Sequence, residues 1–256
     1  MPSPQDLALA RHGHVAHLAL HRPPHNHVDV DLIGRLAEHL EALDADDGCR
    51  AIVLSSSAKA FCAGADFGGV REGGAAFDPG PFYVHAMRLI RTRKPIVAAV
   101  QGAAVGAGLG LALVADFRVT CVGARWSANF NRLGFHPGFG LSVTLPNLVG
   151  AQQAALLFYT GRRIDGAAAV RIGLADELVD DGEVLPRALA LAQEIAASAP
   201  LAVEATRETL RLGLAERIAE ANRRELVLQQ VQFRSDDFRE GVAAMAERRA
   251  PIFHRQ

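Results

Sequence analysis

The sequence predicts an α/β fold, because short apolar segments of strand length alternate with longer segments of helical period. Ala51–Leu54 and Pro95–Val100 are short and continuously apolar, which indicates buried strands. Between them and before them, Val30–Ala45 and Pro81–Arg91 repeat their large apolar residues at helical spacing. Each buried strand is followed by a glycine-rich loop, and the last third of the chain has helical period throughout.

The N-terminal elements follow the same rules of strand and turn chemistry. Leu7–Arg11 and Val15–His21 flank His12-Gly13-His14 and predict a short hairpin. The two prolines in the segment 22–26 predict a loop, since proline cannot donate to a strand ladder. Pro81 is tolerated because it falls in the first turn of its predicted helix.

The C-terminal part is predicted to be helical. The predicted helices are Glu183–Ala197, Pro200–Leu212 and Ala215–Val231. Ser235 has the side chain of an N-cap for a last helix, whose first turn holds Asp236 and Asp237. No internal repeat or low-complexity linker interrupts this pattern.

Composition limits the classes of function. The chain has 256 residues, half of them hydrophobic, and a formal net charge of -1, so it has no basic excess of the kind that nucleic-acid binding requires. Its apolar stretches are too short to span a bilayer, and its first residues lack the basic start and apolar core of a signal peptide. We therefore expect a cytoplasmic protein with no membrane or nucleic-acid partner.

The cysteines predict neither a disulfide framework nor a metal site. Cys49, Cys62 and Cys121 are odd in number, widely spaced and without a C-x-x-C pair. Cys62 lies beside the first glycine loop, where a nucleophilic role is conceivable, but we favour a packing role.

Two glycine loops carry the first indication of chemistry. The first spans residues 60–67 and the second residues 100–110. Small residues let a ligand approach the backbone closely, and the free N–H groups at the start of a helix carry partial positive charge. Two such loops facing each other predict a pocket with two N–H donors for an oxyanion, such as the enolate of a thioester.

A dinucleotide site is a rival interpretation of the second loop. Gly106-Ala-Gly-Leu-Gly110 resembles part of a G-x-G-x-x-G fingerprint. The third glycine has the wrong spacing, because position 111 is leucine, and the acidic residue expected about 20 positions later is missing. We therefore prefer the oxyanion pocket.

A series of motifs, taken in order, resembles the crotonase superfamily, which contains the enoyl-CoA hydratases and isomerases. It covers most of the chain. The motifs are Phe61-Cys-Ala-Gly-Ala-Asp66, Lys94-Pro-Ile-Val-Ala-Ala-Val-Gln-Gly102, Gly106–Asp116, Leu133-Gly134 with Pro137-Gly138, Thr160-Gly161-Arg162, Ala169–Leu174 and Asp236-Asp-Phe-Arg-Glu-Gly241.

The resemblance implies a crotonase-like spiral of β-β-α repeats with a helical C-terminal region. On this basis residues 1–197 form the acyl-CoA-binding core, and residues 198–256 form a helical region that builds a homotrimer or a dimer of trimers. It also implies that coenzyme A is bound as part of the substrate, with no tightly bound cofactor and no metal.

The resemblance also implies roles for individual residues. The amides of Ala65 and Ala107 are expected to form the oxyanion hole. The backbone around Ala63 and Phe67 is expected to face the adenine end of coenzyme A. Arg22 is a candidate for the phosphates, as are Arg248 and Arg249.

The sequence departs from the hydratases of this family at both catalytic glutamates. One glutamate is expected just after the second glycine loop, where this chain has Gly110, and the other before Leu133-Gly134, where it has Phe130. A general acid or base contributes about 10²- to 10⁴-fold to the rate. Efficient hydration of an enoyl-CoA is therefore not expected.

Other side chains are candidates for proton transfer. His136 lies in the segment that lines the acyl pocket in relatives, and imidazole titrates near neutrality. His85 lies on the predicted helix Pro81–Arg91, three residues after Phe82 and four before Leu89, on a face that would border the pocket. Asp116 corresponds to a structural aspartate of relatives, so we do not assign it to catalysis.

Several functions remain open at this point. The chain is either an enzyme that stabilises an enolate or tetrahedral oxyanion, or a protein that binds acyl-CoA without catalysis. As an enzyme it would be an isomerase, decarboxylase, thioesterase or C–C hydrolase, or a weak hydratase. A nucleotide-dependent dehydrogenase is the remaining alternative.

Overall fold

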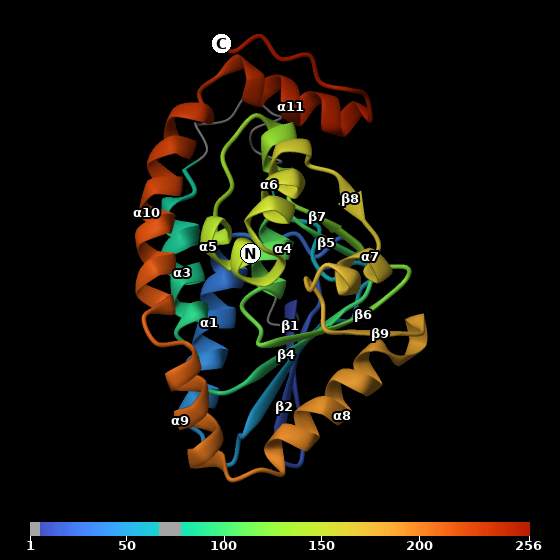
Figure 1. Cartoon of the computed structure of the whole chain (residues 1–256), viewed down its shortest axis with the longest axis vertical. Helices are drawn as coiled ribbons and strands as arrows, with labels where there is room; N and C mark the ends of the chain where they lie inside the picture. The colour runs from blue at the N-terminus through green and yellow to red at the C-terminus, as the bar shows by residue number, and fades with distance from the viewer. Residues whose placement is uncertain (1–5, 67–77) are drawn as a thin grey trace.

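The computed structural model describes residues 6–66 and 78–256, and the fold is the predicted α/β spiral (Figure 1). Its main sheet has six strands in the order β1-β2-β3-β4-β6-β9. The strands are β1 (Leu7–His12), β2 (Val15–Leu20), β3 (Ala51–Ser56), β4 (Ile96–Val100), β6 (Phe117–Cys121) and β9 (Glu177–Val179). The β1–β2 pair is antiparallel, and every other neighbouring pair in this sheet is parallel.

A second, smaller sheet lies beside the glycine loops. It has the order β5-β7-β8, formed by β5 (Ala103–Val105), β7 (Arg125–Ser127) and β8 (Arg163–Ile164). β5 follows β4 after a turn of two residues, so the chain leaves the large sheet and enters the small one at the second glycine loop. The periodicity of the sequence did not predict these short strands, because runs of two or three residues are too short to show a period.

The predicted N-terminal hairpin is confirmed, with His12 opposite Val15. After it, α1 (Val30–Asp44) begins at Asp29, whose carboxylate accepts a hydrogen bond from the Leu32 amide at 2.8 Å. The apolar face of α1 packs against α3 (Gly80–Ile90). Both helices therefore match the predictions from helical spacing to within two residues.

Helix α8 (Val184–Ala196) covers the sheet strands β2, β3, β4 and β6. Its inward face carries Ala188, Ala192 and Ala196, all buried. These small side chains allow the helix to approach the strands closely, and β3 and β4 are buried along their whole length. The core of the protein therefore lies between this helix and the strands on one side, and α1 with α3 on the other.

The remaining helices lie between β5 and α8 in the sequence. They are α4 (Ala107–Ala112), η2 (Asn129–Leu133), α5 (Leu141–Val149), α6 (Ala151–Thr160), α7 (Gly166–Arg171) and η3 (Asp181–Glu183). α4 begins immediately after β5, and η2 follows β7. These connections bring the helical turns after both short strands to the same end of the small sheet.

Three helices close the chain: α9 (Pro200–Leu210), α10 (Leu214–Gln232) and α11 (Asp236–Glu247). α10 packs against α3 and α5, and α11 packs against η2 (Figure 1). The predicted cap is confirmed, because the Ser235 hydroxyl accepts a hydrogen bond from the Phe238 amide at 3.1 Å. The C-terminal region therefore folds back onto the core of its own chain.

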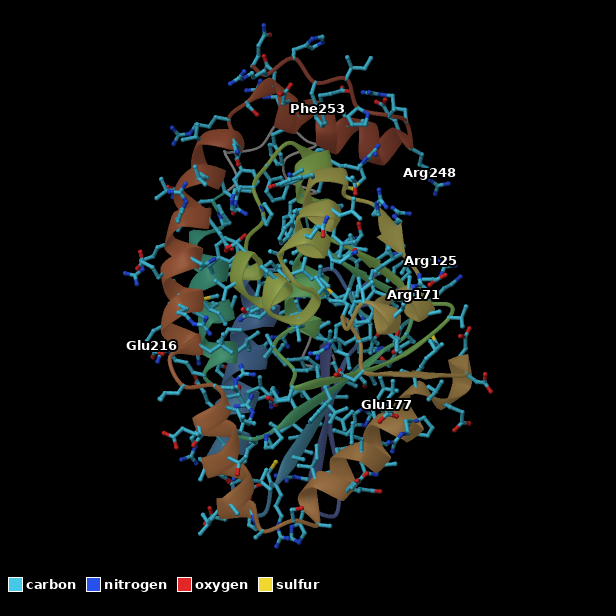
Figure 2. All side chains as sticks on the ribbon, viewed as in Figure 1. Arg125, Arg171, Glu177, Glu216, Arg248 and Phe253 are labelled. Atoms are coloured by element: carbon cyan, nitrogen blue, oxygen red, sulfur yellow. The ribbon has the colours of Figure 1, made fainter. Side chains whose placement is uncertain are left out.

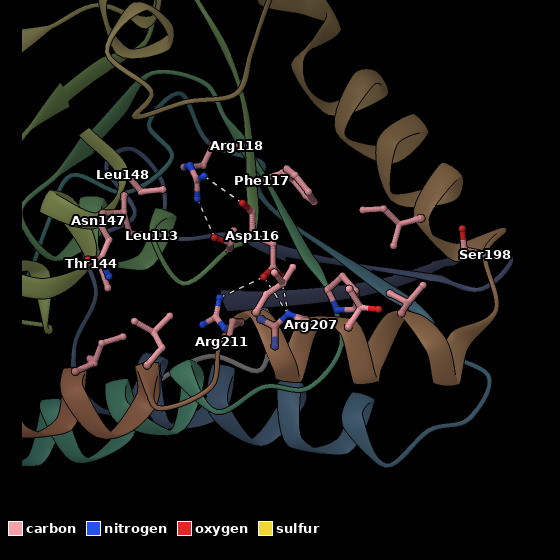
Figure 3. Close-up of a pocket in the computed structure, with 18 of the residues that line it drawn as sticks. Leu113, Asp116, Phe117, Arg118, Thr144, Asn147, Leu148, Ser198, Arg207 and Arg211 are labelled. Carbon is pink, nitrogen blue, oxygen red and sulfur yellow. Dashed lines mark hydrogen bonds and ion pairs between the residues drawn. The ribbon is translucent and has the colours of Figure 1, made fainter. Parts of the chain in front are cut away.

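Asp116 has the structural role predicted for it (Figure 3). Its carboxylate accepts hydrogen bonds from the Ile96 amide at 2.8 Å, from Arg207 at 2.9 Å and from Arg211 at 3.2 Å. These bonds join the start of β4 to α9. The large apolar cavity around this cluster lies between α9, α8 and α5, and neither glycine loop lines it.

Within the described residues, no single helix has the length and apolar composition to cross a bilayer. One pair of helices bent by 105°, Asp181–Ala196 and Pro200–Leu210, meets these two criteria when taken together.

Candidate active site

Backbone hydrogen bonds at Cys62 hold the two glycine loops against each other. The Cys62 amide donates to the Ala103 carbonyl at 2.8 Å, and the Cys62 carbonyl accepts from the Val105 amide at 3.1 Å. These bonds form a parallel β-bridge between Cys62 and Ala104. The first loop is therefore fixed to β5, immediately before α4 begins.

Glycine is required where the loops touch. A Cβ atom on Gly108 would lie 2.0 Å from the Cys62 carbonyl oxygen, well inside van der Waals contact. Gly64 has a φ of +111°, which L side chains rarely adopt, and a Cβ there would lie 3.2 Å from the Val105 carbonyl oxygen. The glycines thus permit a backbone-to-backbone approach that any larger residue would prevent.

The two predicted oxyanion amides line the same pocket. Ala107 is the first residue of α4, so its N–H has no acceptor within the helix, and Gly106 before it has a φ of +56°. Ala65 forms a bridge with Val28 in which Gly64 and Asp66 make the hydrogen bonds. Among the described residues, neither the Ala65 N–H nor the Ala107 N–H donates a hydrogen bond, so both are available to a ligand.

The pocket that contains these amides has mainly apolar and aromatic walls. Its empty volume is about 720 Å³. Aromatic side chains come from four separate segments of the chain and surround the two loops. They are Phe82, Tyr83, Phe130, Phe135 and Phe233. The rings of Phe130 and Phe135 meet edge to face at 5.5 Å. Such a wall excludes water and strengthens hydrogen bonds to a bound carbonyl.

Neither position expected for a glutamate carries a proton donor. Phe130 is buried, lines the pocket and presents only its ring. At Gly110, a Cβ atom would lie 2.6 Å from Cγ of Phe139. A side chain at position 110 therefore has no room unless Phe139 moves.

The structure argues against His85 as the proton carrier. Its ring lies 3.4 Å from where a Cβ of Gly34 in α1 would be, and its Nδ1 is 2.9 Å from Nη1 of Arg88. His85 thus faces α1, whereas its neighbours Phe82 and Tyr83 face the pocket. Phe82 and Tyr83 together occupy the side of α3 that borders the loops, and His85 is not among the described residues that line the pocket.

His136 also lies outside the lining of the pocket. Its backbone is fixed by α10, since its amide donates to Gln232 at 2.7 Å and its carbonyl accepts from Gln229 at 2.7 Å. Its ring Nδ1 is 2.7 Å from the carbonyl oxygen of Pro137. The ring of His136 therefore stabilises its own turn, and the adjacent Phe135 reaches the pocket instead.

The structure places the residues that were expected to contact coenzyme A in different surroundings. Ala63 lines the pocket, and its amide donates to the His25 carbonyl at 3.0 Å. Phe67 lies outside the described residues. Arg22 donates to Asp6 at 2.9 Å and to Asp29 at 2.6 Å. Burial opposes its charge, but these two carboxylates raise the pKa of Arg22 overall. Arg22 is already neutralised, so the structure argues against a phosphate role for it.

Further side chains complete the pocket. His27 and Asp66 are titratable groups in its lining, and Phe233 and Met245 reach it from α10 and α11 and the turn between them. The hydroxyl of Tyr83 donates to Gln229 at 2.9 Å, and burial raises the pKa of Tyr83, so it stays protonated. Asp66 is the last residue of the motif Phe61–Asp66, so the sequence offered a signal for it. No local motif marked Phe233 or Met245.

Cys62 is a packing residue. It is fully buried, and burial raises the pKa of its thiol to about 12. A thiol with this pKa is not a thiolate at neutral pH, and the thiolate is the nucleophile. The described residues also contain no cluster of three or more His, Cys, Asp or Glu side chains that would hold a metal ion.

An arginine cavity adjoins the pocket and shares Asn129, Leu133 and Met245 with it. No carboxylate lines this cavity in the described chain. Its basic residues are His25, Arg132, Arg162, Arg163, Arg248 and Arg249. Arg249 is paired with Glu240 and Glu247, while no described carboxylate pairs with the other four arginines. Figure 2 shows Arg248 at the end of α11, directed away from the ribbon.

Comparisons with known proteins show the family of this chain. A family model described as enoyl-CoA hydratase/isomerase matches residues 10–256. A probable enoyl-CoA hydratase of Rhizobium meliloti is 37% identical over 260 residues, which cover 98% of this chain and 99% of that protein. A carnitinyl-CoA dehydratase of Escherichia coli is 33% identical over 257 residues, covering 97% and 98%.

Solved structures show the same fold. The crystal structure of an enoyl-CoA hydratase/isomerase from Pseudoalteromonas atlantica superposes with a TM-score of 0.88 at 30% identity, covering 98% of this chain and 100% of that one. A carnitinyl-CoA hydratase from Mycobacterium avium gives a TM-score of 0.82 at 29% identity, covering 99% and 100%.

Proposed function

This chain belongs to the enoyl-CoA hydratase/isomerase family, and from that premise we propose that it acts on an acyl-CoA thioester held by the amides of Ala65 and Ala107. The observation that carries the proposal is the pair of free amides in one aromatic pocket, fixed by the hydrogen bonds at Cys62. The thioester oxygen accepts both N–H groups and gains negative charge as an enolate or a tetrahedral oxyanion forms. One such donor stabilises the transition state by about 3 kcal/mol.

The reaction is not efficient hydration. The hydratases of the family add water with two glutamates, and this chain has Gly110 and Phe130 at the corresponding positions. Chemistry that depends mainly on the oxyanion hole fits better, namely isomerisation, decarboxylation, thioester hydrolysis or carbon–carbon cleavage. Where such a step needs a protein base, His27 and Asp66 lie in the pocket, whereas His85 and His136 do not.

The arginine cavity supports binding of the phosphates of coenzyme A. Guanidinium groups bind phosphate oxygens in a bidentate way, and four of the arginines have no carboxylate partner among the described residues. Because the cavity shares walls with the pocket, one ligand is able to occupy both. Arg248 and its neighbours thus replace Arg22 in the phosphate role.

A binding protein without catalysis is the second candidate function. It is favoured by the packing at position 110, where Phe139 leaves no room for any side chain. Such a protein would retain the amides and the arginine cavity and would turn over no thioester.

The exposed apolar residues of the C-terminal helices support assembly into trimers. α9 has no buried residue, and Leu201, Leu210 and Leu212 are 82%, 81% and 81% exposed. Val227 and Val231 of α10 are also exposed, by 62% and 70%. Leaving so many large apolar side chains in water is unfavourable, and a subunit interface formed by residues 198–256 would bury them.

Hydration of crotonyl-CoA, followed as loss of the enoyl-thioester absorbance, tests the proposed chemistry. We expect no fast turnover, with coenzyme A still bound in a calorimetric titration, because no carboxylate faces the thioester. A panel of acyl-CoA thioesters then separates the enzyme from the binding protein. Fast hydration would contradict our interpretation of Gly110 and Phe130, and failure to bind coenzyme A would contradict the proposed function as a whole.

Replacement of arginines tests the phosphate site. The variant Arg162→Ala/Arg248→Ala should bind butyryl-CoA at least about tenfold more weakly, since each lost charged contact is worth about 1.5–3 kcal/mol when desolvated and less when exposed. Its affinity for butyryl-pantetheine, which lacks the phosphates, should not change. Arg22→Ala serves as the matched control for loss of an arginine. Equal weakening for both ligands would place the phosphates elsewhere.

Light scattering tests the assembly. At micromolar concentration we expect the mass of a trimer or hexamer, because the exposed leucines of α9 need a partner surface. Leu201→Glu/Leu210→Glu should reduce that mass, whereas Leu9→Glu in β1, which is 45% exposed and lies outside the proposed interface, should not. A monomeric wild-type protein would refute the proposed interface.

A further inference from the structure

Phe139 has a backbone conformation that is unusual for its residue type. Its φ is +65°, and Gly140 after it has a φ of +70°. Phe139 is nevertheless 2% exposed, with its ring against Gly110 of α4. A bulky residue with positive φ is strained and persists only where its surroundings hold it. The surrounding structure therefore holds Phe139 in a strained backbone conformation that places its ring beside position 110.

Glu225 of α10 holds the backbone that follows Phe139. This carboxylate is 1% exposed and accepts hydrogen bonds from the amide of Gly140 at 2.8 Å and from the amide and hydroxyl of Ser142 at 3.1 and 2.5 Å. Asn222 donates a further bond to it at 3.2 Å. Four donors thus satisfy a buried charge that would otherwise be costly.

The backbone before Phe139 is held by the same helix. Gln229 donates to the carbonyl of His136 at 2.7 Å and accepts from Tyr83, so α10, α3 and the loop form one hydrogen-bonded unit. Gly138 and Gly140 leave no spare room, since Cβ atoms there would lie 1.7 Å from the Tyr83 hydroxyl and 2.3 Å from Ile218. The loop is therefore clamped on both sides of Phe139.

The ring of Phe139 also supports the wall of the acyl pocket. It meets the ring of Phe82 edge to face at 5.8 Å, and Phe82 lines the pocket. Phe139 itself does not line the pocket, and its ring contacts both Phe82 and Gly110 of α4. Removing its ring would open space both behind Phe82 and beside Gly110.

We propose that Phe139 is a specificity-determining residue, which excludes a side chain at position 110 and closes the acyl pocket behind Phe82, and that Glu225 is the residue that positions it. A longer acyl chain is then disfavoured, because the Phe139 ring supports Phe82 in the wall of the pocket. The claim about acyl chains rests on the proposed acyl-CoA function. The claim that Phe139 excludes a side chain at position 110 does not depend on that function.

A double-mutant cycle on thermal stability tests the packing without any ligand. Gly110→Ala should lower the melting temperature in the wild-type background and should lower it much less in the Phe139→Gly background. Glycine is the replacement of choice because it tolerates the φ of residue 139 and removes the three atoms nearest to a new Cβ at position 110, which all belong to the Phe139 side chain. Gly182→Ala, at a site with nothing within 4 Å, is the control and should be additive with Phe139→Gly. Additivity of Gly110→Ala with Phe139→Gly would overturn the packing claim.

Calorimetric titration with butyryl-CoA and decanoyl-CoA tests the specificity. Phe139→Gly should raise the affinity ratio of decanoyl-CoA to butyryl-CoA by at least about tenfold, because burial of the additional methylenes of the longer chain is favourable. Glu225→Gln, which replaces one of the two acceptor oxygens with an NH2 donor facing a backbone amide, should shift the ratio in the same direction. Glu220→Gln, an exposed site on the same helix paired with Arg223, should leave it unchanged.

These outcomes separate the two levels of the proposal. An unchanged ratio in Phe139→Gly, with both ligands still bound, would overturn the specificity role. If no form of the protein binds either thioester, the proposed function fails, and the stability cycle still decides whether Phe139 excludes a side chain at position 110.

Discussion

The contact between the two glycine loops is the constraint on which the rest of the site depends. The Cys62 amide donates to Ala103 of β5, and the Cys62 carbonyl accepts from Val105 of the same strand. This β-bridge joins the first loop to the small sheet. This contact requires glycine at position 108, where any Cβ would meet the Cys62 carbonyl. The amides of Ala65 and Ala107, which are 42 positions apart in the sequence, reach one pocket because this contact fixes both loops.

The C-terminal helices contribute side chains and hydrogen bonds to the site. α10 clamps the loop that carries Phe139 and contacts α3 through the Tyr83–Gln229 bond, while Phe233 and Met245 close the pocket. The pocket therefore has lining residues on both sides of residue 197, the boundary that the sequence predicted between the core and the C-terminal helices. A single change in α10 is expected to reach the acyl pocket through hydrogen bonds.

The sequence predicted those features whose physical signal is local. Ser235 was recognised as a cap from its own type and its acidic neighbours, and the loop glycines from their position after buried strands. The surroundings of His85 and Arg22 depend on tertiary contacts instead, because packing against neighbouring helices decides which face of α3 borders the pocket, and Arg22 is paired with carboxylates from other parts of the chain. Phe139 carried no local signal, since its φ and its contact with Gly110 are tertiary.

The carbonyl stretching frequency of a bound thioester tests the central claim most directly, because it reports polarisation of the carbonyl whatever the reaction is. The measurement uses butyryl-CoA labelled with ¹³C at the carbonyl, in complex with the wild-type protein and with Ala107→Pro. Proline at the first helical position keeps the helix but removes the N–H, and Ala107→Gly, which keeps the N–H, is the control. The account predicts a lower frequency on binding to the wild-type protein and to Ala107→Gly, and a smaller decrease in Ala107→Pro. An unshifted frequency in the wild-type complex, or an equal decrease in all three proteins, would contradict the role of these amides.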